Sequence, residues 1–461
     1  MVLKAIRDSQ HWAHLHPARA GSLAGLFNQA CTISVAILLI PITTSYLPAA
    51  EAGLWFSLQG LVAMVAMMDL GFGFAISRQA AFTLGNTREV NATDDFIQLA
   101  PGISGTYQLF GLTRRLYLIL SAAAVVLCII AYEVFSRVGN LIPPHAEGTR
   151  LAWYCIALAS VISIFSGGYA AFLNGIGAVY QTRILAGLAQ LGAGVGAGVA
   201  ACCGGGLPMM AASFAASTLL YAFAVSYLLR RKMPPLAASE ARLPPPGSLR
   251  ALARAALPIG MVNVFGSLVF MVQAPLLGML LGPEKVVPFY LAQKIGLAFN
   301  MMSMQLALPQ LPFFTRALGN KNWGEVRSRL KATIQKTHLI VLISSLAYFF
   351  LSPWMALVLL RKKEYVDSSV LLIMALDFCI LGITGLGGQF VLASGKNPFV
   401  FSTIFTGITS FSLVILLTPR LGIIALPIST LVAGLVFNYR KCFLEYRKMG
   451  VIYSNQNMQQ T

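Results

Sequence analysis

Long apolar runs dominate this chain and restrict what it can fold into. Almost the whole sequence consists of apolar stretches of 20 to 28 residues that are separated by polar junctions. A helix of about 20 apolar residues spans the ~30 Å hydrocarbon core of a bilayer. Hydrophobic residues make up 57% of the chain and charged residues only 10%, so a soluble core cannot absorb these runs. The sequence therefore predicts an all-α polytopic membrane protein.

Twelve membrane spans are predicted, and this even number places both termini on the same side of the membrane. The predicted spans are 22–46, 54–78, 115–136, 151–176, 182–202, 207–230, 255–281, 286–312, 337–360, 368–393, 398–418 and 421–440.

Lysine and arginine are distributed unevenly between the two sides of the membrane. Of the 33 Lys and Arg residues, 25 lie on the side of the termini, seven lie on the other side, and Lys294 lies within a span. The positive-inside rule then predicts cytoplasmic N and C termini. The same asymmetry explains much of the net charge of +18. The partner of these basic loops is expected to be the lipid bilayer rather than nucleic acid.

The chain divides near its midpoint into two halves of six spans each. A cytoplasmic linker rich in proline separates them, and it is expected to act as a hinge. The predicted parts are a cytoplasmic N-tail at 1–21, an N-lobe at 22–230, the linker at 231–250, a C-lobe at 251–443 and a cytoplasmic C-tail at 444–461.

The two halves resemble each other in the order and spacing of their polar residues and prolines. The first half carries Asn28, Pro41 and Glu51, and the second carries Asn263, Pro275 and Glu284. Because each half has six spans, the repeats are parallel and related by an axis along the membrane normal. The sequence thus predicts two pseudo-symmetric six-helix lobes, a design that suits alternating access in a transporter.

Charged residues inside spans are candidates for function because charge is costly in a bilayer. Lys294 lies ten residues after Glu284, and Asp377 lies ten residues after Asp367. Both are therefore about 15 Å from the outer face along their helices. Two interpretations are open. The residues form a structural ion pair, or Lys294 binds an anion on the lumen wall while Asp377 adjusts its charge or relays a proton.

Asp69 is the third intramembrane charge, and it is predicted to lie toward the cytoplasmic end of the second span. It is interpreted either as a polar helix contact near the cytoplasmic mouth or as a gating or proton-coupling carboxylate.

Uncharged polar residues recur in the spans, among them Asn28, Asn263 and Gln293. Their usual role is hydrogen bonding between helices, and the alternative is that some of them line a path for carbohydrate. No G-x-x-x-x-G-K-[ST], H-E-x-x-H or G-x-S-x-G motif occurs. An enzyme, a bound metal and an organic cofactor are therefore not expected, whereas coupling to H⁺ or Na⁺ remains open.

Several motifs resemble those of a known transporter family. Residues 52–55 read Ala-Gly-Leu-Trp, and residues 68–73 read Met-Asp-Leu-Gly-Phe-Gly, with Arg78 following. Residues 289–295 read Phe-Tyr-Leu-Ala-Gln-Lys-Ile. In this order they resemble the Wzx-type flippases of O-antigen and exopolysaccharide biosynthesis, in the polysaccharide-transporter branch of the MATE/MOP superfamily. The resemblance covers most of the chain, and Asp69, Arg78 and Lys294 are the charged positions that it carries over.

This resemblance implies a flippase that moves undecaprenyl-diphosphate-linked oligosaccharide units across the bacterial inner membrane, with polysaccharide polymerase and chain-length proteins as potential partners. Arginines bind diphosphate well because guanidinium is bidentate, and Arg78, Arg183 and Arg254 are expected at the cytoplasmic mouth. The alternatives are a MATE-like drug or cation antiporter, a lipid II-type flippase and an assembly scaffold that transports nothing. The sequence does not identify the sugar.

Overall fold

The computed structural model describes residues 17–85, 103–137, 147–233, 248–304, 323–359, 365–393 and 397–448. Within these ranges the secondary structure is helical throughout. The chain divides into two compact units, and each of them includes a short stretch from the other half of the sequence. The first unit comprises Met1–Glu51 and Leu61–Asn263, and the second comprises Ala52–Gly60 and Val264–Thr461.

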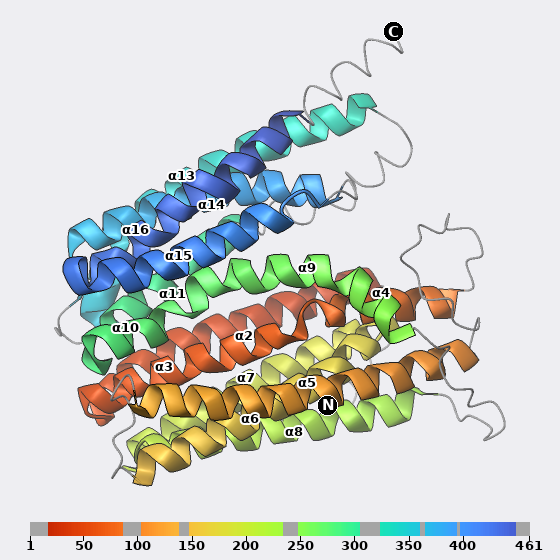
Figure 1. The fold of residues 1–461 in the computed structure, drawn as a ribbon, viewed down its shortest axis with the longest axis horizontal. Coiled ribbons are helices and arrows are strands. Elements are labelled where there is room, and N and C mark those ends of the chain that lie inside the picture. The colour runs from red at the N-terminus through yellow and green to blue at the C-terminus, as the bar shows by residue number, and fades with distance from the viewer. Residues whose placement is uncertain are drawn as a thin grey trace, which may run out of the picture. The chain divides into compact units, whose positions relative to one another are not determined.

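Figure 1 shows the helices of the first half. They are α2 (Pro17–Tyr46), α3 (Ala49–Ala66), the 3₁₀ helix η1 (Met67–Asp69), α4 (Phe72–Gly85), α5 (Ile103–Arg137), α6 (Glu147–Gly175), α7 (Val179–Cys202) and α8 (Gly206–Lys232).

The second half has the same succession of long apolar helices. They are α9 (Ser248–Met271), α10 (Gln273–Leu281), the 3₁₀ helix η3 (Pro283–Lys285), α11 (Val286–Met304), α13 (Trp323–Leu359), α14 (Ser368–Ala393), α15 (Val400–Leu421), the 3₁₀ helix η5 (Gly422–Ile424), α16 (Ala425–Ala433) and the π-helix η6 (Gly434–Tyr439).

Ten helical stretches among the described residues are long and apolar enough to cross a membrane. One of them, Val400–Lys448, contains both α15 and α16, which meet at Gly422 with a positive φ of 64°. Helix α11, which carries Lys294, is not among the ten. With α15 and α16 counted separately and α11 included, the helices match the twelve predicted spans, and the all-α polytopic fold is confirmed.

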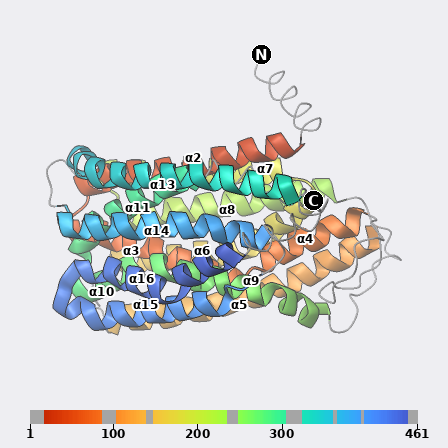
Figure 2. The ribbon, with the colours of Figure 1, turned by 90° about the horizontal axis from the view of Figure 1, so that it is seen from above.

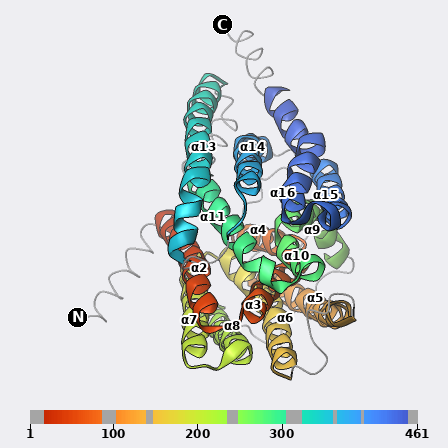
Figure 3. The ribbon, with the colours of Figure 1, turned by 90° about the vertical axis from the view of Figure 1, so that its left-hand side faces the viewer.

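The helices of each unit pack in the same pairwise pattern. In the first unit α7 packs against α2 and α8, α6 packs against α4, α5 and α8, and α4 packs against α5. In the second unit α15 packs against α10 and α16, α14 packs against α11, α13 and α16, and α11 packs against α13. Figure 3 shows α14 between α13 and α16, and Figure 2 shows α15 beside α16. Each of these six pairs in one unit has its counterpart in the other, which is the packing expected of a duplicated six-helix lobe.

Alternating glycines let α7 pack closely on both sides. Successive residues are about 100° apart around a helix, so positions two apart point to opposite faces. A Cβ at Gly194 would lie 2.5 Å from a methyl carbon of Val35 on α2, whereas a Cβ at Gly196 would lie 3.0 Å from Cβ of Ser213 on α8. Small residues at such contacts allow helix backbones to approach in a membrane. The sequence pattern thus encodes a helix with two close neighbours.

The structure corrects the second predicted span, which is not one continuous helix. It consists of α3, η1 and α4, with a break at Leu70 and Gly71. In the second half, α13 begins at Trp323, before the start of the predicted span 337–360. Some predicted parts lie outside the described residues: 1–16 of the N-tail, 234–247 of the linker, and 305–322. The predicted boundaries of the two lobes remain a prediction.

Candidate functional site

Lys294 is positioned by α11, and it faces an aromatic ring. Its side chain is half-buried, and its Nζ lies 4.9 Å from the centre of the Tyr290 ring, one helical turn earlier. An ammonium group over an aromatic face is stabilised by the ring quadrupole. No described carboxylate forms an ion pair with Lys294, and the Tyr290 ring is its described partner.

The predicted ion pair between Lys294 and Asp377 is absent from the described residues, and helix geometry explains why. The face of α11 that meets α14 carries Gly296, where a Cβ would lie 2.0 Å from Cε2 of Phe378, and Asn300, whose Nδ2 donates to the Phe378 carbonyl oxygen at 2.9 Å. Lys294 is two residues from Gly296 and therefore points to the opposite side of the helix. Lys294 and Asp377 therefore do not contact each other, although they were predicted to lie at the same depth.

Gln293 is buried, and it joins α11 to the junction of α9 and α10. Its Nε2 donates to the Phe270 carbonyl oxygen at 3.1 Å and to Oε1 of Gln273 at 2.6 Å. The structure therefore gives this side chain two hydrogen bonds between helices, which is the usual role of such residues in membranes.

The aromatic ring under Lys294 also contacts the stretch of α3 that belongs to the second unit. Phe56 and Tyr290 stack with ring centres 4.6 Å apart. One turn further along α3, Nε2 of Gln59 is buried and has no hydrogen-bond partner among the described residues. Leaving a buried donor unsatisfied costs about 1–3 kcal/mol. Gln59 thus lies about one helical turn from Phe56, and Lys294 lies about one helical turn from Tyr290. The two side chains flank the same stacked pair of rings.

These residues also occupy matching positions in the two sequence repeats. Phe56 and Tyr290 are 234 residues apart, as are Gln59 and Gln293 and the two repeat prolines. In the sequence, Gln59 was overlooked because it is uncharged. The signal that could have revealed it is its match to Gln293 at the repeat offset.

Asp377 lies in the interior of the second unit and is 3% exposed. Its Oδ2 accepts a hydrogen bond from Thr430 on α16 at 2.8 Å, and its Oδ1 accepts one from Tyr439 at the end of η6 at 2.8 Å. If Asp377 is protonated, it must itself donate one hydrogen bond. Protonation would therefore rearrange its contacts with α16 and η6.

A local irregularity places Tyr439 beside Asp377. Residues Gly434–Tyr439 form a π-helical turn, and a Cβ at Gly434 would lie 2.4 Å from the Tyr439 ring. Glycine thus leaves room for the ring, and the wider turn shifts the register of the residues after it. Such turns are frequent at functional sites.

Asp69 lies at the break between α3 and α4 in the first unit. Leu70 and Gly71 both have positive φ, 46° and 72°, and Leu70 is the one non-glycine residue with positive φ among those described. Oδ2 of Asp69 accepts a hydrogen bond from the Gly73 backbone N–H at 3.1 Å. This is the bonding pattern of a helix cap, because the first N–H groups of α4 have no partner within their helix.

A buried tyrosine links Asp69 to α5. Tyr117 is 1% exposed and donates its phenolic hydrogen to Oδ1 of Asp69. Its ring lies against Gly168 of α6, where a Cβ would be 2.4 Å from the ring. The carboxylate therefore holds the start of α4 and one side of α5 together.

The break is also a point of close backbone approach within the first unit. A Cβ at Gly260 of α9 would lie 1.9 Å from the carbonyl oxygen of Leu70. Only glycine fits at this position without moving one of the two backbones.

The remaining predicted site residues belong to the first unit, whereas Lys294 belongs to the second. Arg183 on α7 and Arg254 on α9 are exposed, and Asn28 on α2 is half-buried. Arg78 lies on α4 and Asn263 lies on α9, but their side chains are outside the described part. The described residues contain no group of three or more His, Cys, Asp or Glu side chains that could hold a metal ion.

Comparison with solved structures identifies the fold. An inward-facing multidrug resistance MATE family transporter of the MOP superfamily is 16% identical to this chain, with 94% of this chain and 99% of that chain covered and a TM-score of 0.69. The lipid II flippase MurJ, in an inward closed conformation, is 12% identical, with 94% and 90% covered and a TM-score of 0.63.

A third solved structure is a MOP superfamily transporter from Pyrococcus furiosus, which is described as having a binding pocket of reverse polarity that suggests a different function. It is 15% identical, with 94% of this chain and 95% of that chain covered and a TM-score of 0.63. No protein-family model and no curated protein matches the sequence. The chain thus has the fold of the MOP-superfamily transporters.

Proposed function

We propose that this protein is an alternating-access flippase of the bacterial inner membrane that moves undecaprenyl-diphosphate-linked oligosaccharide units from the cytoplasmic to the periplasmic leaflet. Its N and C termini would lie in the cytoplasm. It would translocate its substrate without chemical change, as a step in O-antigen or exopolysaccharide biosynthesis, and a polysaccharide polymerase and chain-length proteins would act next.

The observation that carries the proposal is the environment of Lys294. A half-buried lysine on a transmembrane helix, with an aromatic ring as its described partner, retains a positive charge that an anion would neutralise. Charge in a membrane is costly unless it is paired. The negative charge of a diphosphate headgroup would pair with Lys294 when the substrate enters.

The neighbouring groups of Lys294 suit a substrate that is both anionic and rich in hydroxyl groups. Gln59 has a buried Nε2 without a described partner, and an amide N–H is a good donor to a sugar hydroxyl or a phosphate oxygen. We therefore add Gln59 to the predicted substrate residues. Arg78, Arg183 and Arg254 remain proposed as diphosphate ligands at the cytoplasmic mouth, and Asn28, Asn263 and Gln293 as polar contacts along the path.

We propose that Asp377 and Asp69 couple the movement of the substrate to an ion. Asp377 bonds to α16 and η6, and Asp69 bonds to α4 and α5. Binding of H⁺ or Na⁺ at either carboxylate would change hydrogen bonds between helices rather than within one helix. This supports the proposal that both carboxylates gate the conformational change.

A drug or cation antiporter is the second candidate, and the likeness to a MATE family transporter with a TM-score of 0.69 favours it. An antiporter for cations needs an acidic site for its substrate. Lys294 would repel a cationic drug, and the two carboxylates are occupied by hydroxyl donors. The lipid II-type alternative has the same requirement for cations as the proposed flippase, and it differs in the sugar.

The test uses a strain in which the gene has been deleted. If the proposal holds, lipid-linked repeat units accumulate on the cytoplasmic face and surface polysaccharide is lost. The wild-type gene restores export. Lys294→Ala is expected to reduce export at least tenfold at equal protein level, whereas Lys294→Arg keeps the charge and restores part of it.

The matched control is Lys336→Ala, which removes an exposed lysine from α13 and is expected to leave export unchanged. Normal surface polysaccharide in the deletion strain would rule out the flippase. Unchanged polysaccharide together with lost efflux of a cationic dye would support the antiporter instead, and accumulation of lipid II would support the third alternative.

A further inference from the structure

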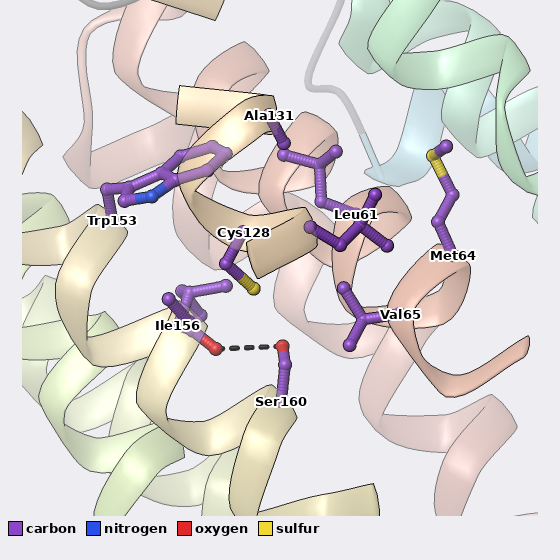
Figure 4. A pocket seen from close by; sticks show the side chains of 10 residues that line it. Leu61, Met64, Val65, Cys128, Ala131, Trp153, Ile156 and Ser160 are labelled. Atoms are coloured by element: carbon purple, nitrogen blue, oxygen red, sulfur yellow. Dashed lines mark hydrogen bonds between the residues drawn. The ribbon is translucent and has the colours of Figure 1, made fainter. Parts of the chain in front are cut away.

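A small apolar pocket lies within the first unit, and Asp69 is not among the residues that line it. It has a volume of about 50 Å³ and is enclosed by α3, α5 and α6 (Figure 4). Leu61 and Val65 line it from α3, Cys128 lines it from α5, and Trp153 and Ile156 line it from α6. Protein interiors are packed closely and contain few voids larger than a water molecule, so a pocket of this size needs an explanation.

The chemistry of the pocket excludes a polar ligand. Its one hydroxyl group, on Ser160, donates to the Ile156 carbonyl oxygen of its own helix at 2.8 Å and so offers no free donor. The Cys128 sulfur points into the space between α6 and α3 (Figure 4), and a thiol is a weak hydrogen-bonding group. A water molecule needs two to four polar partners to occupy a cavity, and this lining does not supply them.

The lining of the pocket is partly exposed, and exposed apolar side chains lie next to it in the sequence. Cys128 is followed on α5 by Ile129 and Ile130, which are 59% and 54% exposed. Ala131 on α5 and Ala157 on α6 line the pocket and are only half-buried. In a bilayer the medium beside such apolar side chains is hydrocarbon.

We propose that this pocket binds a segment of a hydrocarbon chain, drawn from the bilayer or from a lipid-linked substrate. Apolar cavities in proteins stay dry and bind hydrocarbons. The volume is several times the roughly 10–15 Å³ that a single water requires on the same scale. It therefore has room for a few carbon atoms, such as a chain end or one methyl-branched unit, but no room for a sugar ring.

Photolabelling can test whether a hydrocarbon chain binds next to Trp153 and Cys128. The experiment uses the full chain in lipid nanodiscs and two photoactivatable probes. One is a phosphatidylcholine with a diazirine at the end of an acyl chain, and the other is a polyprenyl phosphate with a diazirine at the end of its chain. Mass spectrometry of peptides then locates the adducts, which are expected on the segments that contain Cys128 and Trp153.

A pair of matched variants controls for folding and for the general lipid surface. Ala157→Leu adds three carbon atoms inside the pocket, and it is expected to reduce labelling of these segments at least fivefold. Ala123→Leu makes the same addition at an exposed position on α5, and it should leave labelling unchanged. Size-exclusion chromatography and thermal unfolding check that both variants fold.

The two probes distinguish the source of the chain. Labelling by the acyl probe alone identifies a bilayer lipid, and labelling by the polyprenyl probe, reduced by an unlabelled polyprenyl phosphate, identifies a lipid carrier. Both results support the pocket as a hydrocarbon site. Labelling of these segments that is equal in the wild type and in Ala157→Leu overturns it. Because the proposal does not depend on flippase activity, we expect Lys294→Ala to leave labelling unchanged.

Discussion

Each of the two units holds one carboxylate with hydrogen bonds, but they hold it in different ways. Asp377 in the second unit lies within an unbroken helix, is 3% exposed and accepts hydrogen bonds from two side chains of α16 and η6. Asp69 in the first unit lies at a helix break, is half-buried and divides its oxygens between one tyrosine and the backbone of its own span. The units share a pattern of helix pairing, whereas their polar interiors differ.

This difference shows which features the two units share and which they do not. The helix pairs follow from small residues and apolar surfaces, which many sequences provide. A buried carboxylate needs specific partners, because each unpaired oxygen in hydrocarbon is costly. The second unit meets that need with side chains from another helix, and the first unit meets part of it with a helix terminus.

The largest effect is expected from removing the Asp377 carboxylate. In Asp377→Ala, the buried hydroxyls of Thr430 and Tyr439 both lose their acceptor, and each unsatisfied group costs about 1–3 kcal/mol. We expect a loss of about 3 kcal/mol in the free energy of unfolding, measured by denaturation in detergent. Asp377→Asn keeps one acceptor oxygen and should lose about half as much.

The matched control for this prediction is Asp367→Asn, which removes an exposed charge ten residues earlier in the chain and keeps a favoured residue at the start of α14. Its stability should change by less than about 0.5 kcal/mol, as is usual for surface substitutions. Equal losses for Asp377→Asn and Asp367→Asn would contradict the view that Asp377 is held by its two hydroxyl donors.

A smaller effect is expected at the break in the first unit. Gly71 has a φ of 72°, and a side chain in this left-handed region costs about 1–2 kcal/mol. A Cβ there would also lie 2.8 Å from the Gly260 backbone nitrogen. We expect Gly71→Ala to destabilise the protein by about 2 kcal/mol and to reduce transport.

The control for Gly71→Ala is Gly111→Ala on α5, where a Cβ would meet no atom within 4 Å. Alanine is favoured over glycine inside a helix by up to about 1 kcal/mol, so this variant should be neutral or slightly more stable. If both variants change stability in the same direction by the same amount, the left-handed turn is not needed.

Much of the fold was predictable from the sequence because a bilayer imposes simple rules. Apolar length predicts spans and excludes strands, and small residues predict close helix contacts such as those of Gly194 and Gly196. The break at Leu70 was missed because apolar content does not fall there. An aspartate that precedes two glycines in Asp69-Leu70-Gly71-Phe72-Gly73 was the available signal, since it is a typical helix cap.

The candidate site was only partly predictable, because depth in a membrane can be counted along a helix but direction around it depends on neighbours. Lys294 and Asp377 were predicted to lie at equal depth and to be close, yet the contact of Gly296 with Phe378 turns Lys294 away from α14. The partners of Asp377 were missed because Thr430 and Tyr439 carry no charge. The register of Tyr439 depends on a π-helical turn, which no local pattern predicts.

The smallest expected effect concerns the single side-chain partner of Asp69. Asp69→Asn retains one acceptor oxygen, and Tyr117→Phe removes the phenol, so each should lower the free energy of unfolding by about 1 kcal/mol. Because the two groups contact each other, the double variant should lose less than the sum, with a coupling energy of about 0.5–1.5 kcal/mol. The same cycle with Asp377→Asn and Tyr117→Phe should be additive, since these residues have different hydrogen-bond partners. Additivity in the first cycle would mean that Tyr117 does not hold Asp69, and the carboxylate at the break would then act only as a helix cap.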